Sequence, residues 1–112
     1  MDDLPLITKT EELYGASLRV CEKLSGLQRQ TLGRRLEDAI LSLLEYEIMA
    51  KNAPRPNKAP YLIKACALQE VIMIFLRLMI NQNLANQTTL HQLQARTLEI
   101  GRMLGGWRKS IG

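Results

Sequence analysis

The sequence has few of the residues on which most catalytic and metal sites depend. Its 112 residues include a single histidine, His91, and two cysteines, Cys21 and Cys66, which lie 45 positions apart. This spacing excludes a disulfide framework and a zinc cluster, so we interpret both cysteines as small core residues. Glu45 and Glu47 are two residues apart on a predicted helix and do not form a carboxylate pair, although Glu47 could turn inward. We therefore expect a protein that is not an enzyme, with no catalytic residue, no metal and no cofactor.

Long hydrophobic runs are also missing. The most apolar stretch, residues 71–80, has ten residues and includes Arg77, whereas a membrane-spanning helix needs about 20. The first residues are acidic and lack the apolar segment of a secretory signal. With 46% hydrophobic and 23% charged residues, the composition is that of a folded protein rather than a disordered one. These features predict one soluble, cytoplasmic domain over residues 1–112, with no membrane partner.

Strand-favouring runs are scarce, and the prolines and glycines fall mostly between periodic segments, which predicts an all-α fold. Thr8 with Glu11, and Thr89 with Gln92, have the spacing of a capping box at the start of the first and last helices. Short connections make successive helices antiparallel, so we expect an up-down-up-down antiparallel four-helix bundle. The expected helices span residues 9–24, 31–52, 60–82 and 89–110.

The third predicted helix has more apolar surface than a monomeric bundle requires. Nine of the ten residues from 71 to 80 are hydrophobic, so this segment is apolar nearly all the way round. One interpretation is a long core helix with scattered exposed Ile and Met residues. The interpretation that we favour is a second face, formed by some of Met73, Leu76 and Ile80, that packs against another subunit. The pattern thus predicts a homo-oligomer.

Three glycines, Gly101, Gly105 and Gly106, lie within the last predicted helix, because its apolar spacing continues to Trp107 and Ile111. A glycine inside a helix costs about 1 kcal/mol relative to alanine, which suggests that something comes close to this backbone. We expect a neighbouring helix there. A nucleic-acid backbone is the alternative.

The sequence is moderately basic, with 15 Lys and Arg against 11 Asp and Glu, a formal charge of +4. Residues 53–64 contain cations and no acid, and residues 88–112 contain four cations against Glu99 alone, so each segment has a net charge of +3. In the predicted bundle both segments meet at one end, partly offset by Asp2 and Asp3. A second basic group that includes Arg29 lies near the opposite end. The residues predicted to bind nucleic acid are Arg55, Lys58, Lys64, Arg102, Arg108, Lys109, Arg34 and Arg35.

Another interpretation of these cations remains open, because cations near helix C-termini offset the helix dipole and exposed arginines favour solubility. If the basic end is repeated around a ring of subunits, the fields add and phosphate binding becomes the stronger interpretation. None of the five aromatic residues alternates with the cations in the sequence, so we expect binding to RNA or DNA to be largely independent of base sequence.

Two stretches of the chain resemble a known family. The run Gln30-Thr31-Leu32-Gly33-Arg34-Arg35-Leu36-Glu37-Asp38-Ala39-Ile40 and the run Ile100-Gly101-Arg102-Met103-Leu104-Gly105-Gly106-Trp107 are similar to the two signatures of the accessory variability determinant (Avd) proteins of diversity-generating retroelements. The resemblance covers most of the chain up to Ser110, and the glycine, arginine and tryptophan pattern near the C-terminus is its most specific part.

The resemblance implies a four-helix bundle that forms a basic homopentamer and binds both a reverse transcriptase and nucleic acid. Its expected role is to support the error-prone copying of a template RNA, known as mutagenic retrohoming. Related bundles encoded in intervening sequences of bacterial ribosomal RNA leave an alternative open, namely a structural or protein-binding oligomer without nucleic-acid binding.

Overall fold

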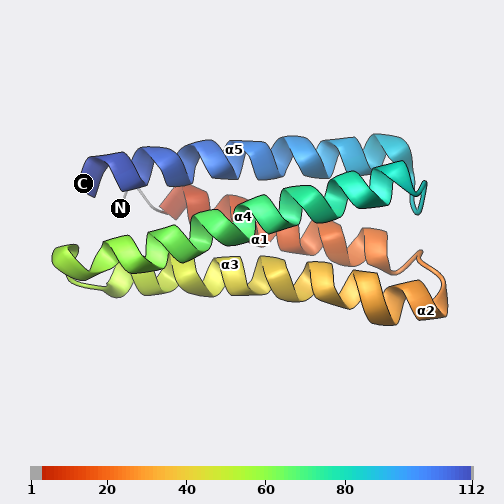
Figure 1. Cartoon of the computed structure of the whole chain (residues 1–112), viewed down its shortest axis with the longest axis horizontal. Helices are drawn as coiled ribbons and strands as arrows, with labels where there is room; N and C mark the ends of the chain where they lie inside the picture. The colour runs from red at the N-terminus through yellow and green to blue at the C-terminus, as the bar shows by residue number, and fades with distance from the viewer. Residues whose placement is uncertain (1–3, 112) are drawn as a thin grey trace.

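The computed structural model describes residues 4–111, and within this range it contains helices and no strand. Four long helices lie side by side in a body that measures 44 × 22 × 19 Å (Figure 1). No helix in this range is both long and apolar enough to span a membrane. The long helices are α1 (Leu4–Cys21), α3 (Arg34–Asn52), α4 (Lys58–Asn81) and α5 (Gln87–Ile111).

Each long helix packs against two others, so that α1, α3, α4 and α5 surround one core. Figure 1 shows that the chain reverses direction between successive long helices, a course compatible with the predicted up-down-up-down order. The core is formed by residues spaced three and four apart on each helix, as expected for helices that bury one face. Its largest fully buried side chains are Leu6, Leu13, Leu36, Ile40, Leu43, Leu62, Ile72, Leu76, Met79, Leu90, Leu93 and Ile100.

Both predicted capping boxes are wrong, because the first and last helices begin earlier than expected. Helix α1 begins at Leu4 and has Pro5 in its first turn, where the missing backbone donor costs nothing. Helix α5 begins at Gln87, and the side-chain oxygen of Asn86 accepts a hydrogen bond from the backbone amide of Thr89 at 3.0 Å. Asparagine is among the best N-cap residues, so Asn86 caps the helix in place of Thr89.

The second predicted helix also starts earlier than residue 31. After the short helix α2 (Gly26–Gln28), a π-helical turn over Arg29–Gly33 leads directly into α3. Gly33 is buried in this turn, and a Cβ atom added there would lie 3.3 Å from Leu24 Cδ1 and 3.4 Å from Cys21 Sγ. Gly33 therefore allows the second helix to lie close to the end of α1. Leu27 of α2 lies beyond the end of α1 and is 75% exposed.

The glycines of α5 lie inside the helix as predicted, but only one of them makes a close contact within this chain. A Cβ atom added to Gly101 would lie 2.6 Å from Gln69 Nε2 of α4. At Gly105 and Gly106 an added Cβ atom would meet nothing within 4 Å. The expected close approach of a neighbouring helix is confirmed at Gly101, whereas the other two glycines face open space.

Candidate nucleic-acid interface

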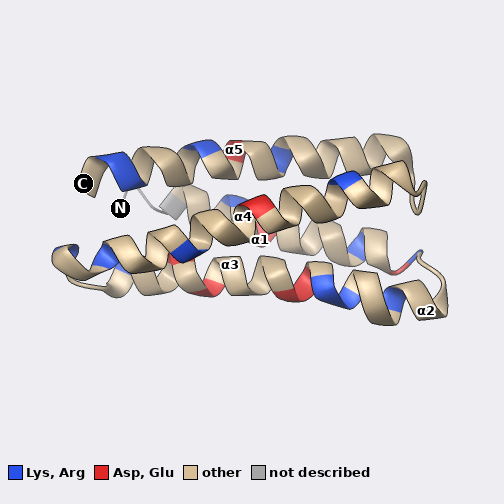
Figure 2. Ribbon diagram, in the orientation of Figure 1, with Lys and Arg blue, Asp and Glu red and all other residues tan. Residues whose placement is uncertain are grey.

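The linker between α3 and α4 and the end of α5 meet at one end of the bundle, as the charge pattern predicts. The guanidinium of Arg55 donates a hydrogen bond from Nη2 to the backbone oxygen of Ser110 at 3.0 Å. Figure 2 shows basic residues of α4 and α5 at this end. Asp2 and Asp3, predicted to offset this charge, lie outside the described residues.

Two of the predicted phosphate ligands at this end already bind helix carbonyls. Lys58 Nζ donates to the oxygen of Ala50 at 2.7 Å and to that of Lys51 at 3.0 Å, at the end of α3. Arg55 does the same at the end of α5 through Ser110. Helix C-termini carry partial negative charge and unpaired carbonyls, so these contacts favour the helix-dipole interpretation for Arg55 and Lys58. A phosphate would have to compete with these caps.

The other predicted cations of this half of the molecule lie on the sides of the helices. Lys64 lies over the Tyr46 ring at 5.5 Å from its centroid, a cation–π contact between α4 and α3. Arg102, Arg108 and Lys109 are exposed on α5, and Arg102 and Lys109 are seven residues apart and therefore on one face. These three are the best placed of the predicted ligands to meet an anion.

Arg34 and Arg35 are exposed at the start of α3, near the opposite end of the molecule. Both line an open hollow that also contains Phe75 of α4. Arg34 lines a second hollow as well, in which Glu22 and Glu37 offset its charge. The long axis of the bundle separates this group from the basic end (Figure 2), so the eight predicted residues do not form one site within a single chain.

The outer face of α4 carries an apolar strip, but the predicted interface residues are not the ones that form it. Leu76 is only 1% exposed and belongs to the core, which corrects its assignment to an outer face, and Met73 and Ile80 are half-buried. The exposed apolar residues of α4 are spaced four, four, three and four positions apart. They lie on the side of the helix opposite its core residues and extend over about 22 Å. We call this set the α4 strip; its members are Ile63, Ala67, Val71, Ile74 and Leu78.

A second apolar periodicity of three and four residues on α4 was the signal that the sequence interpretation missed. The four large members of the α4 strip are 42 to 51% exposed. Nothing in the described part of the chain covers them. A helix of a monomeric bundle normally has a polar outer face, so the exposure of this strip indicates a surface that meets a partner.

One carboxyl group is buried inside the bundle. Glu47 of α3 turns inward, as the sequence allowed, and is fully buried; its Oε2 accepts a hydrogen bond from Thr10 Oγ1 at 2.9 Å. Its Oε1 has no hydrogen-bond partner among the described residues. Burial raises the pKa of Glu47 to about 8, and the bond from Thr10 only partly opposes this. Residues 4–111 contain no group of three or more His, Cys, Asp or Glu residues that could hold a metal ion.

A groove between α1 and α5 gathers basic residues that sequence reasoning did not combine. Arg19 of α1 and Lys23, in the turn that follows α1, line it together with Arg96 of α5. In the first predicted helix, residues 9–24, Arg19 and Lys23 are four residues apart and would share one face, which was the available signal. The pairing of that face with Arg96 depends on how the two helices pack.

Comparisons with known proteins identify no relative of this chain. No protein-family model matches the sequence, and a search of curated proteins finds no significant match.

Proposed function

We propose that this chain is a non-enzymatic accessory protein of a diversity-generating retroelement, of the Avd kind. In this proposal the up-down-up-down bundle forms a homopentamer in the cytoplasm, binds the reverse transcriptase, and holds RNA or DNA without base specificity during mutagenic retrohoming. The observation that carries the proposal is the α4 strip, because it exposes four large apolar side chains on a helix whose other face already forms the core. Such a surface supports assembly into a larger particle.

The two sequence signatures behind the resemblance have packing roles in the structure. Gly33 of the first signature lies against Leu24 and Cys21, and Gly101 of the second lies against Gln69. An added Cβ atom would make a tight contact at Gly33 and would force Gln69 to move at Gly101, so both glycines fit the close packing of the bundle. The signatures thus support membership of a group of similar bundles more directly than they support a binding activity.

The distribution of exposed cations supports a nucleic-acid role for an assembly rather than for one chain. Arg102, Arg108 and Lys109 of one chain form a small group, and their charge is modest by itself. When symmetric copies bring such groups together, their potentials add and attract polyanions more strongly. Each phosphate that is neutralised releases counterions, which makes the affinity dependent on salt concentration.

The salt dependence of binding to single-stranded RNA tests this proposal. We expect log K to fall linearly with log salt concentration for the unmodified protein. The double variant Arg108→Gln with Lys109→Gln should reduce the slope by about 1.4, which corresponds to two lost phosphate contacts at about 0.7 each. Affinity is measured by fluorescence anisotropy with labelled RNA over a series of salt concentrations.

The matched control removes the same charge at the same end of the bundle. Arg55→Gln with Lys58→Gln breaks the contacts with Ser110, Ala50 and Lys51. We expect this variant to melt at a lower temperature and to keep the salt slope of the unmodified protein. A flat salt response of the unmodified protein, or a slope that depends on Arg55 and Lys58 instead, contradicts the assignment.

The capping contacts of Arg55 and Lys58 favour a second candidate function. If most of the positive charge serves helix ends, the chain is a structural or protein-binding oligomer of the ribosomal-RNA intervening-sequence type. This function predicts the same assembly through the α4 strip and an RNA affinity that is weak and insensitive to Arg108 and Lys109. The experiment above therefore separates the two candidates.

A further inference from the structure

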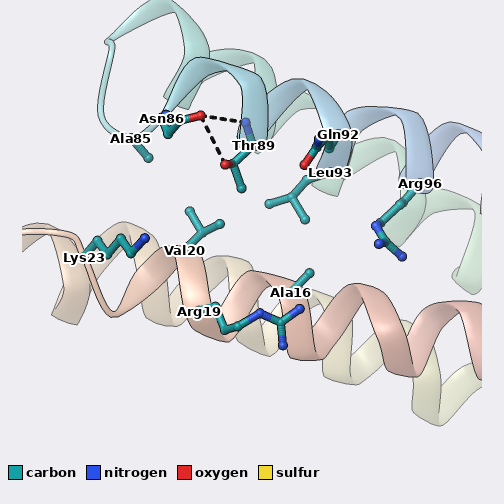
Figure 3. Close-up of a pocket in the computed structure, with 10 residues that line it drawn as sticks. All are labelled: Ala16, Arg19, Val20, Lys23, Ala85, Asn86, Thr89, Gln92, Leu93 and Arg96. Atoms are coloured by element: carbon teal, nitrogen blue, oxygen red, sulfur yellow. Dashed lines mark hydrogen bonds between the residues drawn. The ribbon is translucent and has the colours of Figure 1, made fainter.

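The groove between α1 and α5 combines a positive rim with an apolar floor (Figure 3). It has a volume of about 300 Å³ and lies beside the turn that leads into α5. Val20 and Leu93 face each other between the two helices and are both buried, and Ala16 and Ala85 extend this apolar surface. The volume is at the lower end of the range of about 300 to 1,000 Å³ that is typical of ligand pockets, so the groove suits one small molecule.

The rim of the groove is positive. Arg19, Lys23 and Arg96 line it, and no carboxylate is among its lining residues. Arg96 extends from α5 toward α1 in Figure 3. Its only ion pair within residues 4–111 is with Glu12, at 3.9 Å between two half-exposed side chains, which is a weak interaction in water. The guanidinium of Arg96 therefore remains able to bind an anion.

The N-terminus of α5 adds to this positive potential. Asn86 lines the groove and caps α5, a helix of 25 residues, through bonds from the amide and hydroxyl groups of Thr89. The first turn of a long helix carries partial positive charge. Arg19 and Lys23 also lie near the C-terminus of α1, where cations offset the opposite dipole. Arg96 lies in the middle of α5 and has no such structural reason to be basic.

We propose that this groove binds one nucleotide unit, with its phosphate held by Arg19, Lys23 and Arg96 and its sugar or base against Val20 and Leu93. A phosphate alone would leave the apolar floor uncovered, and an apolar ligand alone would leave the cations unused. No aromatic side chain lines the groove, so recognition should be nearly independent of the base. The nucleotide is either free or part of a single strand. The free-nucleotide form is independent of the proposed retroelement function; the strand form rests on it.

Binding of AMP and of a short single-stranded oligonucleotide to the full chain tests the proposal. Methyl signals of Val20 and Leu93 in NMR spectra report on occupancy of the groove, and titration calorimetry gives the affinity. We expect AMP to shift these signals, and adenosine and inorganic phosphate each to bind more weakly than AMP. Arg19→Gln with Arg96→Gln should weaken AMP binding about tenfold or more, because two charge-assisted contacts are lost.

The matched control removes two cations that lie outside the groove and are not among the proposed RNA ligands. Lys51→Gln with Arg77→Gln makes the same charge change at exposed positions and should leave AMP affinity within about twofold. If only the oligonucleotide shifts the groove signals, and does so in a way that depends on Arg19 and Arg96, the site holds a nucleotide of a strand. If neither probe shifts them, or if binding is equal in both double variants, the proposal is overturned.

The two functional experiments fail independently of each other. RNA binding that depends on Arg108 and Lys109, with no signal change at Val20 and Leu93, would retain the retroelement proposal and overturn the nucleotide groove. AMP binding that depends on Arg19 and Arg96, with no salt-dependent RNA binding, would do the reverse.

Discussion

At the scale of single residues, polar groups inside the core make the stability of this protein sensitive to pH and to small substitutions. Glu47 is buried with one carboxyl oxygen that has no hydrogen-bond partner in residues 4–111, and Gln69 donates from Nε2 to the backbone oxygen of Thr97 at 3.0 Å. Buried polar groups cost free energy when they are charged or lack a partner. Cys21 follows the same physics, because burial above all raises the pKa of its thiol to about 12, with Glu37 adding to the effect. Cys21 is therefore an inert core residue.

The raised pKa of Glu47 predicts a pH-dependent stability. Its pKa is about 8 in the folded chain and about 4.5 when exposed, so the folded state retains a proton that the unfolded state loses as the pH rises. The stabilisation is complete below pH 4.5 and is lost as the pH rises through 8. Over this window the free energy of unfolding should fall by about 1.4 kcal/mol per pH unit. Glu47→Gln should remove this dependence, as measured by urea denaturation at several pH values.

Glu45→Gln is the control for this prediction, because it makes the same substitution at an exposed position of the same helix. It should keep the pH dependence of the unmodified protein. Identical pH profiles for Glu47→Gln and the unmodified protein would show that Glu47 is not the titrating group.

At the scale of helices, the glycines of α5 differ in their surroundings, because one packs against α4 and another lies on an open surface. Gly101 lies against the Gln69 side chain of α4, and Gln69 is held by its hydrogen bond to the backbone oxygen of Thr97. Gly106 is exposed and has no such neighbour. Replacing these two glycines of one helix should therefore have opposite effects on the stability of the fold.

Alanine substitution should reveal this difference. Gly101→Ala places a Cβ atom 2.6 Å from Gln69 Nε2, so Gln69 must move and lose its hydrogen bond, at a cost of about 1–3 kcal/mol. Gly106→Ala should stabilise the fold by about 0.5–1 kcal/mol through better helix propensity. Chemical denaturation of both variants checks the prediction. A stabilising Gly101→Ala would mean that Gln69 adapts without loss, and a destabilising Gly106→Ala would point to a partner packed on that glycine.

At the scale of the whole molecule, a core that is complete within one chain coexists with the α4 strip outside it. Of the α4 residues predicted to face a partner, Leu76 is buried in the core and Met73 and Ile80 are half-buried. The exposed apolar residues are those of the α4 strip, on the opposite side of the helix. The 44 Å length of the bundle keeps the cations of its two ends apart. Only association of several copies would cover the α4 strip and bring the cations of different chains together into a strongly positive surface.

A charge placed in the α4 strip should prevent this association. We expect the unmodified protein to be an oligomer at micromolar concentration and Ile74→Glu to be a monomer, because a carboxylate buried between apolar surfaces is costly. Multi-angle light scattering gives the mass, and circular dichroism checks that the variant remains helical. Leu98→Glu on α5, equally exposed at 46%, is the matched control and should remain an oligomer. A monomeric unmodified protein would contradict the role of the strip.

The sequence by itself determined the helical class, the core face of α3 and the approximate position of the connections. Residues such as Leu36, Ile40 and Leu43 recur at helical spacing, and this local periodicity is sufficient to identify a buried face. Helix starts were less predictable, because Thr89 and Asn86 are both good caps and only the packed chain shows that Asn86 is used.

The tertiary structure alone decided what the charged and polar residues do. The sequence alone gives Arg55 and Lys58 no partner. In the folded chain Arg55 binds the carbonyl of Ser110 at the end of α5, 55 residues away, and Lys58 binds the carbonyl of Ala50 at the end of α3, eight residues away. Likewise the groove joins Arg19 to Arg96, and no local pattern connects two residues 77 positions apart. Hydrophobic burial follows a short-range period, whereas the partner of a charge depends on which distant backbone carbonyl or helix the fold places beside it.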